Sequence, residues 1–315
     1  MADSIKKATR DSYGEALVAL AEEFPELVVL DADLSHATKT IGFSKAYPDR
    51  FFNCGIAEGN MMCVAAGLAA AGKTVFASTF AMFAAGRAFE QVRNSIGYPH
   101  LNVKIGATHA GISVGEDGAS HQCCEDIALM RTIPGMTIIN PADDAEAKKA
   151  IRAALEMKGP VYMRFGRLAL PVVTDPDADF VIGKATELAA GTDVTLIATG
   201  LLVGEALKAA EMLKADGISA RVLNMATIKP LDDAAVLKAA AETGCIVTAE
   251  EHTVIGGLGG AVAECVCAGR PVPVLRVGVE DIFGRSGPAA ELLPLYGLCA
   301  ENIAGKAKMA VGMKG

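Results

Sequence analysis

The sequence predicts an α/β protein with two consecutive open, mainly parallel-sheet domains. Short runs rich in β-branched residues alternate with alanine-rich stretches of helical character. The short runs are apolar throughout, which is typical of parallel strands buried on both faces. The chain has 315 residues, which exceeds the usual length of one domain, roughly 100 to 200 residues.

The first domain is expected to span residues 1–172, with helices between most of its strands. Its strands are predicted at 27–31, 74–79, 102–107, 136–140 and 161–165. A linker is placed at 173–186, because the stretch PVVTDPDADFVIG at 171–183 combines prolines and aspartates and has little periodicity.

The second domain, residues 187–315, repeats this alternation. The helix predicted at 204–217 ends at Gly217 and places Leu207, Ala210 and Leu213 on one face. The strands of this domain are predicted at 193–199, 219–224, 245–249 and 272–279. Ligands of such sheets bind beyond the carboxyl ends of the strands, so polar residues that follow an apolar run are candidate site residues.

Composition and charge exclude several classes of protein. Hydrophobic residues make up 51% of the chain and charged residues 21%, which excludes a disordered or coiled-coil chain. A net charge of -8 without a basic stripe argues against nucleic-acid binding. The most apolar stretch, 59–86, is interrupted by Lys73, so we expect no membrane span. The polar N-terminus lacks the apolar segment of a secretory signal, so we expect a cytoplasmic protein.

The segment THAGISVGEDGASHQ, residues 108–122, concentrates histidines, carboxylates and glycines directly after a predicted strand. Glycines let the backbone approach a ligand closely. His109 and His121 are candidates to bind an anionic or hydroxylated substrate and to move protons near neutral pH. An alternative is a metal site that adds the pair Cys123 and Cys124, although the spacing matches no standard metal motif.

Glu58 lies at the predicted start of a helix, in NCGIAEGNMM. A glutamate in the first helical turn commonly interacts only with the helix dipole. The apolar neighbours of Glu58 in sequence would, however, desolvate its carboxyl group. These neighbours are Cys54, Ile56, Met61 and Met62. We therefore treat Glu58 as a candidate to share a proton with a nitrogen heterocycle.

Phe80 and Phe83 follow the strand predicted at 74–79, three residues apart. Ordinary core packing explains such a pair equally well. If the pair has a function, the two rings would stack against a flat ligand.

Residues 67–74, GLAAAGKT, match the phosphate-binding pattern GxxxxGK[ST] and would indicate a nucleotide hydrolase. That motif requires a strand before the loop and a helix after it. Here a predicted helix precedes the motif and a predicted strand follows it, so we interpret these residues as the end of a helix.

Residues 256–260, GGLGG, follow a strand and open a helix as a dinucleotide-binding loop would, but Val262 occupies the position of the third small residue. We predict a tight turn with close backbone packing. The preceding Glu250, Glu251 and His252 receive no functional assignment, because helix capping and interface contacts are expected to explain them.

Taken together, several motifs in this order resemble transketolase. The resemblance covers nearly the whole chain but only the C-terminal half of the full-length enzyme, namely its pyrimidine-binding and C-terminal domains. The motifs are DADLS (31–35), GIAE (55–58), STFAMF (78–83), HAGISVGEDGASHQ (109–122) and TIKPLD (227–232) with EEH (250–252).

The resemblance implies a split transketolase. Transketolases hold the diphosphate of thiamine diphosphate through Mg²⁺ at a GDG motif followed by an asparagine, and this motif is absent here. The GEDG at 115–118 is a different element. The resemblance thus implies that this chain binds the aminopyrimidine end of the cofactor, and that an N-terminal-half subunit with the GDG…N motif binds Mg²⁺. Two copies of each chain would form a heterotetramer.

The resemblance also implies roles for individual residues in the transfer of a two-carbon ketol unit from a ketose phosphate to an aldose phosphate. Glu58 would hydrogen-bond the ring nitrogen N1′ of the cofactor, Phe80 and Phe83 would enclose its aminopyrimidine, and Asp33 would lie near its thiazolium. The catalytic residues would be Glu58, His109 and His121. The substrate would be bound by His109, Asp117, His121 and Arg167, with Arg164 as a substitute for Arg167. No metal ligand is assigned in this chain.

The sequence departs from the transketolase pattern at Gly59 and Gly86, so the substrate does not follow from the resemblance and other functions stay open. The alternatives within the superfamily are a 2-oxoacid dehydrogenase beta subunit and a deoxyxylulose phosphate synthase-like enzyme. A non-catalytic regulatory subunit, in which Glu58 is only a helix-terminal charge, is a third alternative.

Overall fold

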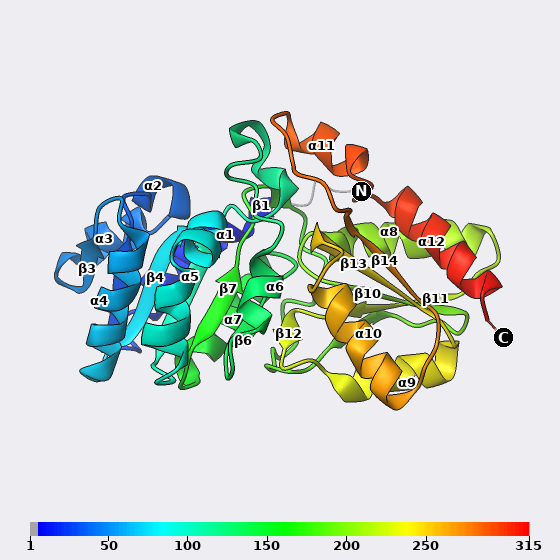
Figure 1. Ribbon diagram of the computed structural model, residues 1–315, viewed down its shortest axis with the longest axis horizontal. Coiled ribbons are helices and arrows are strands. Elements are labelled where there is room, and N and C mark those ends of the chain that lie inside the picture. Colours follow the sequence, from blue (N-terminus) through cyan, green and yellow to red (C-terminus); the bar gives the residue numbers. More distant parts are fainter. Residues whose placement is uncertain (1–5, 315) are drawn as a thin grey trace.

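The computed structural model describes residues 6–314, which form two α/β units that lie side by side (Figure 1). Each unit has its own mainly parallel sheet, as the alternation of apolar runs and helical stretches predicts. A small antiparallel ribbon pairs β1 (Lys7–Ala8) with β8 (Ala169–Leu170). No helix among the described residues is both long enough and apolar enough to cross a membrane.

The first sheet has seven strands in the order β12-β6-β7-β5-β4-β2-β3. All neighbours are parallel except β12, which runs antiparallel to β6. The five strands predicted for this domain are confirmed, and the short edge strand β3 is an addition. The strands are β2 (Leu27–Asp31), β3 (Phe51–Asn53), β4 (Thr74–Phe80), β5 (Val103–Thr108), β6 (Thr137–Ile139), β7 (Val161–Arg164) and β12 (Thr227–Lys229).

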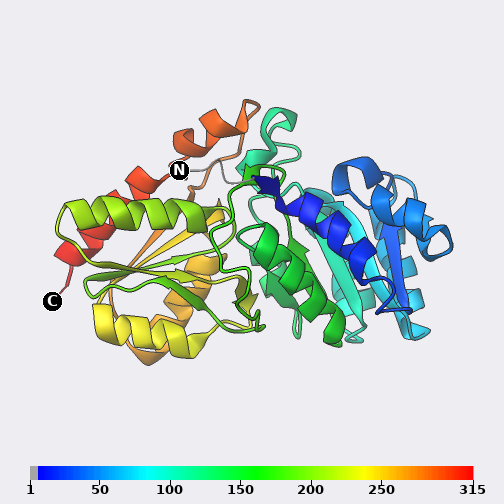
Figure 2. The ribbon, with the colours of Figure 1, turned by 180° about the vertical axis from the view of Figure 1, so that it is seen from behind.

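Helices cover both faces of this sheet. One face carries α1 (Thr9–Leu20) and α7 (Asp144–Glu156), seen in front in Figure 2. The other face carries α4 (Glu58–Ala70), α5 (Phe89–Gln91) and α6 (Asp126–Arg131). The helix α7 begins where the Asp143 side chain accepts a hydrogen bond from the Glu146 amide, as an N-cap does. Two short helices, α2 (Ser35–Thr38) and α3 (Ile41–Ala46), follow β2 and precede β3 along the chain.

The second sheet has the order β14-β13-β10-β11-β9, and only β9 is antiparallel to its neighbour. Its four predicted strands are confirmed, and β13 extends four residues beyond the predicted end. The strands are β9 (Thr186–Ala189), β10 (Val194–Ala198), β11 (Ala220–Asn224), β13 (Ile246–Thr253) and β14 (Val274–Val279). The helices are α8 (Leu202–Ala215), α9 (Asp233–Thr243), α10 (Leu258–Gly269), α11 (Ala289–Leu295) and α12 (Ala300–Gly312).

The helix predicted at 204–217 corresponds to α8. Gly217 lies just after its end in a left-handed conformation, φ 78°, as a helix-terminating glycine does. Of the predicted buried face, Ala210 and Leu213 are buried, whereas Leu207 is only half-buried.

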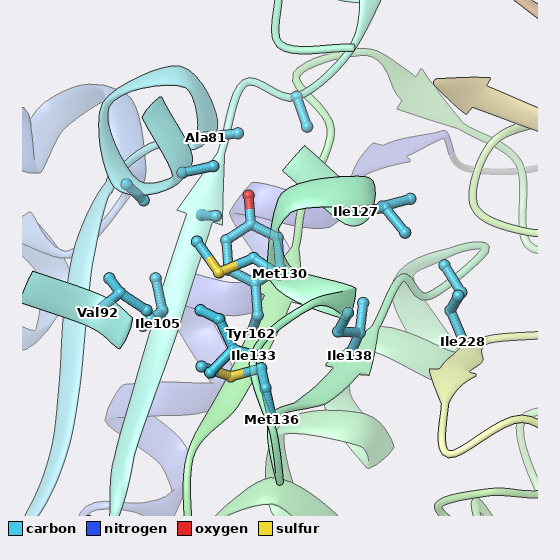
Figure 3. Close-up of a cluster of buried hydrophobic side chains, with 14 of the residues drawn as sticks. Ala81, Val92, Ile105, Ile127, Met130, Ile133, Met136, Ile138, Tyr162 and Ile228 are labelled. Atoms are coloured by element: carbon cyan, nitrogen blue, oxygen red, sulfur yellow. The ribbon is translucent and has the colours of Figure 1, made fainter. Parts of the chain in front are cut away.

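A strand from the second half of the sequence completes the first sheet. Strand β12 lies between β11 and α9 in the chain but pairs with β6. Its Ile228 belongs to the same hydrophobic cluster as Ile127 and Ile138 of the first unit (Figure 3). Because one apolar core runs through both units, they are joined by buried surface and not only by the connecting chain.

A buried carboxyl group also lies between the two units. Glu146 of α7 accepts hydrogen bonds from the Ala142 amide and from Asn224 Nδ2 of β11, each at 2.7 Å. Burial raises the pKa of Glu146 to about 7. The negative charge of Glu146 therefore costs stability in the folded protein.

Replacement of Glu146 by glutamine is expected to make stability less dependent on pH. An unfolded glutamate titrates near pH 4.3, so wild type loses stability as the pH rises from about 4.3 to 7, while the neutral variant does not. The unfolding free energy of E146Q relative to wild type should increase by about 3 kcal/mol between pH 4 and pH 8. Thermal unfolding of both proteins across this pH range measures the difference. The control is Glu156→Gln, which changes an exposed glutamate on the same helix. A difference that does not vary with pH would contradict the assignment.

Candidate active site

The residues that the sequence singles out lie at one edge of the seven-stranded sheet. Asp33 follows β2, Glu58 opens α4 after β3, Phe80 ends β4, His109 follows β5 and Arg167 follows β7. Parallel strands end at the same edge, so loops far apart in the sequence meet there. The prediction that polar residues after the apolar runs gather at the carboxyl ends of the strands is confirmed.

The Glu58 side chain is 2% exposed and is paired with Arg87. The Arg87 Nη1 atom lies 3.0 Å from each carboxylate oxygen. Met61 and Met62, on the next turn of α4, are fully buried. Ile56, by contrast, is 78% exposed, so the expected apolar surroundings are provided from the helix side and not by this residue.

Arg87 is not among the site residues predicted from the sequence. It ends the π-helical segment η2 (Phe83–Arg87), and its guanidinium carbon lies 4.4 Å from the centroid of the Phe83 ring. Single π-turns within helices frequently occur at functional sites. An arginine inside the otherwise apolar stretch AMFAAGRAF was the available signal.

Phe80 and Phe83 stack on each other, with ring centroids 5.8 Å apart and an interplanar angle of 15°. The His109 ring stacks on Phe80 with centroids 3.9 Å apart. The His121 ring meets Phe83 edge-on at 5.4 Å, and its Nδ1 lies 2.9 Å from Ser120 Oγ. The two phenylalanines are in stacked contact, which leaves no gap between the rings for a ligand. Phe80 is buried and stacked on His109, so the half-buried Phe83 is the ring that a flat ligand can reach.

His109 is buried and is held by two polar neighbours. Its Nε2 lies 2.8 Å from Arg10 Nη1, and its Nδ1 lies 2.9 Å from Thr108 Oγ1. A guanidinium group can only donate, so Nε2 accepts. Burial, and then the charges of Arg10, Arg167 and Lys39, lower the pKa of His109 to about 3. The His109 ring is therefore neutral near pH 7, and its role in proton transfer stays a prediction.

Asp33 is exposed and left-handed, φ 66°, and its Oδ1 accepts a hydrogen bond from Asn53 Nδ2 at 2.9 Å. Asp31, which lies in the DADLS motif but is not among the predicted site residues, is fully buried at the end of β2. It accepts hydrogen bonds from Thr38 Oγ1 at 2.7 Å and Thr40 Oγ1 at 2.9 Å. Burial raises the pKa of Asp31, against the effect of these bonds. Asp31 thus anchors the loop that carries Asp33.

Arg167 lies on the outside of the segment 109–122, which we call the histidine loop. Its Nη1 donates to the Val114 carbonyl at 2.7 Å. The same atom lies 3.6 Å from the Glu116 carboxylate and 3.8 Å from that of Asp117. All three charged side chains are partly exposed, so Arg167 and Asp117 remain accessible to a ligand.

Arg164 is buried and is engaged entirely within the protein. Its Nε donates to Asp126 Oδ2 at 2.9 Å, and its Nη2 donates to the carbonyls of Cys123 and Glu251 at 3.2 and 2.7 Å. These neighbours raise the pKa of Arg164 further above its usual range, against the effect of burial. The expectation that Arg164 substitutes for Arg167 as a phosphate ligand does not hold.

The alternative metal site does not form. Among residues 6–314, no group of three histidine, cysteine or acidic side chains converges to hold a metal ion. Burial raises the pKa of the Cys123 thiol, which opposes the thiolate form that a metal would bind. All eight cysteines are free.

The two glycine-rich motifs have the structural roles that their context predicts. Helix α4 ends at Ala70, Gly72 is left-handed with φ 94°, and β4 begins at Thr74, so residues 67–74 form a helix end. Gly257 and Gly259 pack so closely that a side chain at either position would meet neighbouring atoms. Nothing in this geometry supports nucleotide binding.

The residues of the EEH motif at 250–252 also form structural contacts. Glu250 accepts hydrogen bonds from the Leu258 and Gly259 amides, at 2.7 and 2.8 Å, and so caps α10. The Ala128 amide donates to His252 Nε2 at 3.2 Å, between the two units. Helix capping and interface contacts therefore explain Glu250 and His252, as predicted.

Comparison with known protein families gives two matches along the chain. Residues 5–173 match the transketolase pyrimidine-binding domain, and residues 183–303 match the transketolase C-terminal domain. Together these matches cover most of the chain.

Individual relatives are similar over nearly their whole length. A Methanocaldococcus jannaschii protein provisionally named as a transketolase C-terminal section is 54% identical, with 95% of each chain covered. A 6-deoxy-6-sulfo-D-fructose transketolase subunit from a Clostridium species is 45% identical, covering 93% of this chain and 91% of the relative. One of the subunits of an apulose-4-phosphate transketolase from Phocaeicola vulgatus is 41% identical, covering 94% of this chain and 95% of the relative.

A solved structure described as a split-gene transketolase in an inactive β4 tetramer is 53% identical, with a TM-score of 0.91 and 98% and 99% of the two chains covered. The transketolase of Leishmania mexicana is 26% identical with a TM-score of 0.85. The chain matches about half of that enzyme, since it covers 47% of it.

Proposed function

The chain belongs to the transketolase family, in which it corresponds to the pyrimidine-binding and C-terminal domains, and we propose that it is one subunit of a split transketolase. The subunit binds the aminopyrimidine end of thiamine diphosphate. A second polypeptide with the GDG…N motif holds the diphosphate and Mg²⁺. The complex transfers a two-carbon ketol unit between a ketose and an aldose. The observation that carries this proposal is the buried Glu58 carboxylate beside the Phe80–Phe83 pair.

The donor set at this edge suits an aminopyrimidine. Glu58 supplies a buried carboxylate that can accept a hydrogen bond from a protonated ring nitrogen, and Arg87 fixes its orientation through both oxygens. The half-buried Phe83 ring of the stacked pair suits a flat ring. When bound, thiamine diphosphate supplies the electron sink that lets a carbon–carbon bond beside a carbonyl break and re-form. The task of Glu58 is to hold the proton of the ring nitrogen at its carboxylate.

Positive charge around the histidine loop suits an anionic group on the sugar. Arg10, Lys39 and Arg167 all lie close enough to lower the pKa of His109. The Arg10 Nε atom is buried and has no hydrogen-bond partner among residues 6–314, so it can donate to a ligand. Neutral His109 holds the Arg10 guanidinium in place through Nε2. We infer a ketose with a terminal phosphate or sulfonate, the two groups named for the Phocaeicola and Clostridium relatives.

An uncharged helix face suits the partner subunit. After Glu58, α4 contains no charged residue, yet Asn60, Cys63, Val64 and Gly67 on its outer side are exposed. Phe52 of the neighbouring strand β3 is exposed as well. Because the exposed side of α4 carries no charge and is largely apolar, this face is the proposed contact with the partner.

We expect the chain alone to show no turnover of xylulose 5-phosphate and no tight binding of thiamine diphosphate, and we expect both after addition of the partner. A coupled assay with each subunit alone and with the mixture measures turnover, and calorimetry measures cofactor binding. Replacing xylulose 5-phosphate by the sulfo-sugar or by apulose 4-phosphate identifies the substrate. Turnover by this chain without a partner would contradict the split-subunit proposal.

A further inference from the structure

The histidine loop has an irregular backbone, which is held partly by its own hydrogen bonds, such as those from Gln122 Nε2 to the Ile112 and Gly115 carbonyls, and partly by contacts with other segments. His109, Gly111, Gly115 and Gly118 all have positive φ, and regular structure is limited to the short 3₁₀ segment η4 (Ile112–Asp117). The glycines adopt positive φ readily, whereas a non-glycine residue such as His109 keeps this conformation only where the surrounding structure holds it. The same loop carries His109, Asp117 and His121. Whatever holds the loop therefore determines where these side chains lie.

Part of that support comes from Glu251 on β13, in the other α/β unit. Its Oε1 accepts a hydrogen bond from the Ser113 amide at 2.5 Å. A side chain at Gly111, where φ is 80°, would collide with the Glu251 side chain, so the loop backbone lies directly against it. Arg164 Nη2 bridges the carbonyls of Cys123 and Glu251 and thereby ties the end of the loop to the same strand.

Glu251 differs from its neighbours in the EEH motif. Alternate residues of a strand face opposite sides of the sheet. Glu250 and His252 therefore share one side, where they contact α10 and the start of α6, while Glu251 points to the histidine loop. The role of Glu251 is thus separable from helix capping.

Burial of the Glu251 carboxyl group costs free energy of folding. Glu251 is 3% exposed, and burial raises its pKa to about 7. The charged and titratable groups around it are Arg164, Asp126 and Cys124. A residue kept only for packing would be more stable as a hydrophobic side chain of similar size. The carboxyl group supplies something that such a side chain lacks, namely an acceptor for the Ser113 amide.

We propose that Glu251 is a positioning residue, which holds the histidine loop so that Asp117 and His121 are presented to the sugar substrate while His109 stays in place against Arg10. This inference rests on the proposed function. It also gives the C-terminal domain a part in the reaction, although none of its side chains is assigned to substrate or cofactor.

The test compares Glu251→Leu and Glu251→Gln in the reconstituted complex. Leucine has a similar shape but cannot accept a hydrogen bond, whereas glutamine retains the acceptor oxygen. We expect E251L to raise the KM for the ketose by about 10- to 100-fold, with unchanged thiamine diphosphate affinity and a lower Tm, because the Ser113 amide loses its buried acceptor. E251Q should stay within about threefold of wild type. The control Glu250→Leu, at equal burial on the opposite side, should lower Tm without changing KM.

Hydrogen exchange gives a readout that needs no turnover. Amides 111–115 should exchange at least about tenfold faster in E251L than in wild type, and not faster in E251Q. If E251L fails to assemble, Glu251→Asp replaces it, because the shorter side chain withdraws the acceptor while keeping the charge. Unchanged KM and unchanged exchange would overturn the proposal. If the wild-type complex itself is inactive, the proposed function fails, and the exchange comparison still decides the role of Glu251.

Discussion

Replacement of Glu58 by glutamine is expected to lower the turnover of the reconstituted complex by about 1000-fold, within the range for loss of an acid–base group. Glutamine has nearly the same shape, so the helix and the surrounding packing are retained. It cannot hold a proton from a ring nitrogen, and it cannot form the ion pair that Arg87 makes with both carboxylate oxygens. Steady-state kinetics at saturating cofactor measure the effect. Sedimentation of the complex shows whether assembly is intact.

The matched control is Glu90→Gln, on the neighbouring helix α5. Glu90 is exposed and contacts only Gln91 and Asn94 by hydrogen bonds among the described residues. The control should leave turnover and assembly unchanged. If E58Q keeps turnover within about tenfold of wild type, Glu58 is only a helix-terminal charge, and the regulatory-subunit alternative gains support.

Replacement of Val64 by glutamate is expected to prevent binding of the partner subunit. Val64 lies on the exposed side of α4 and is 38% exposed. A carboxylate placed there would be buried without a counter-charge once the partner covers this helix, which costs several kcal/mol. The affinity between the subunits should fall by at least about 100-fold, and activity should be lost with it. Calorimetric titration of the partner into the variant measures the affinity.

The control for this experiment is Met212→Glu, on α8 of the other unit. Met212 is 39% exposed, so both variants place the same charge on a side chain of equal exposure. We expect M212E to bind the partner with unchanged affinity. If V64E binds as tightly as M212E, the outer side of α4 is not the contact surface, and another face of the subunit must hold the partner.

Most strands of the fold could be predicted because each is marked by the composition of its own few residues. Runs such as LVVLD at 27–31 are apolar throughout, and a parallel strand buried on both faces requires this composition. Strand β12 was not predicted, because the three residues of TIK gain their strand conformation only by pairing with β6 of the other unit. The edge strand β3 was missed for a similar reason, since FFN is too short to show a period.

The sequence predicted which kinds of residue form the candidate site, but it did not predict which of them contact one another. Glu58 and the phenylalanine pair are carried by motifs, and they lie at the predicted edge of the sheet. Arg10 and Arg87 were missed because each meets its partner across a long stretch of chain, 99 residues to His109 and 29 residues to Glu58. The proton-moving role expected of His109 depended on burial and on neighbouring cations, which no local pattern shows.

The amino-acid sequence by itself determined the α/β class, the order of the strands along the chain and the kinds of side chain available at their ends, because hydrophobic period and turn residues act over a few positions. Only the tertiary structure decided which of these side chains meet. It buried His109 against a guanidinium, confined Arg164 within the protein and turned Glu251 toward the histidine loop. Electrostatic and hydrogen-bonding partners depend on distances in space, and these arise only once both sheets are packed.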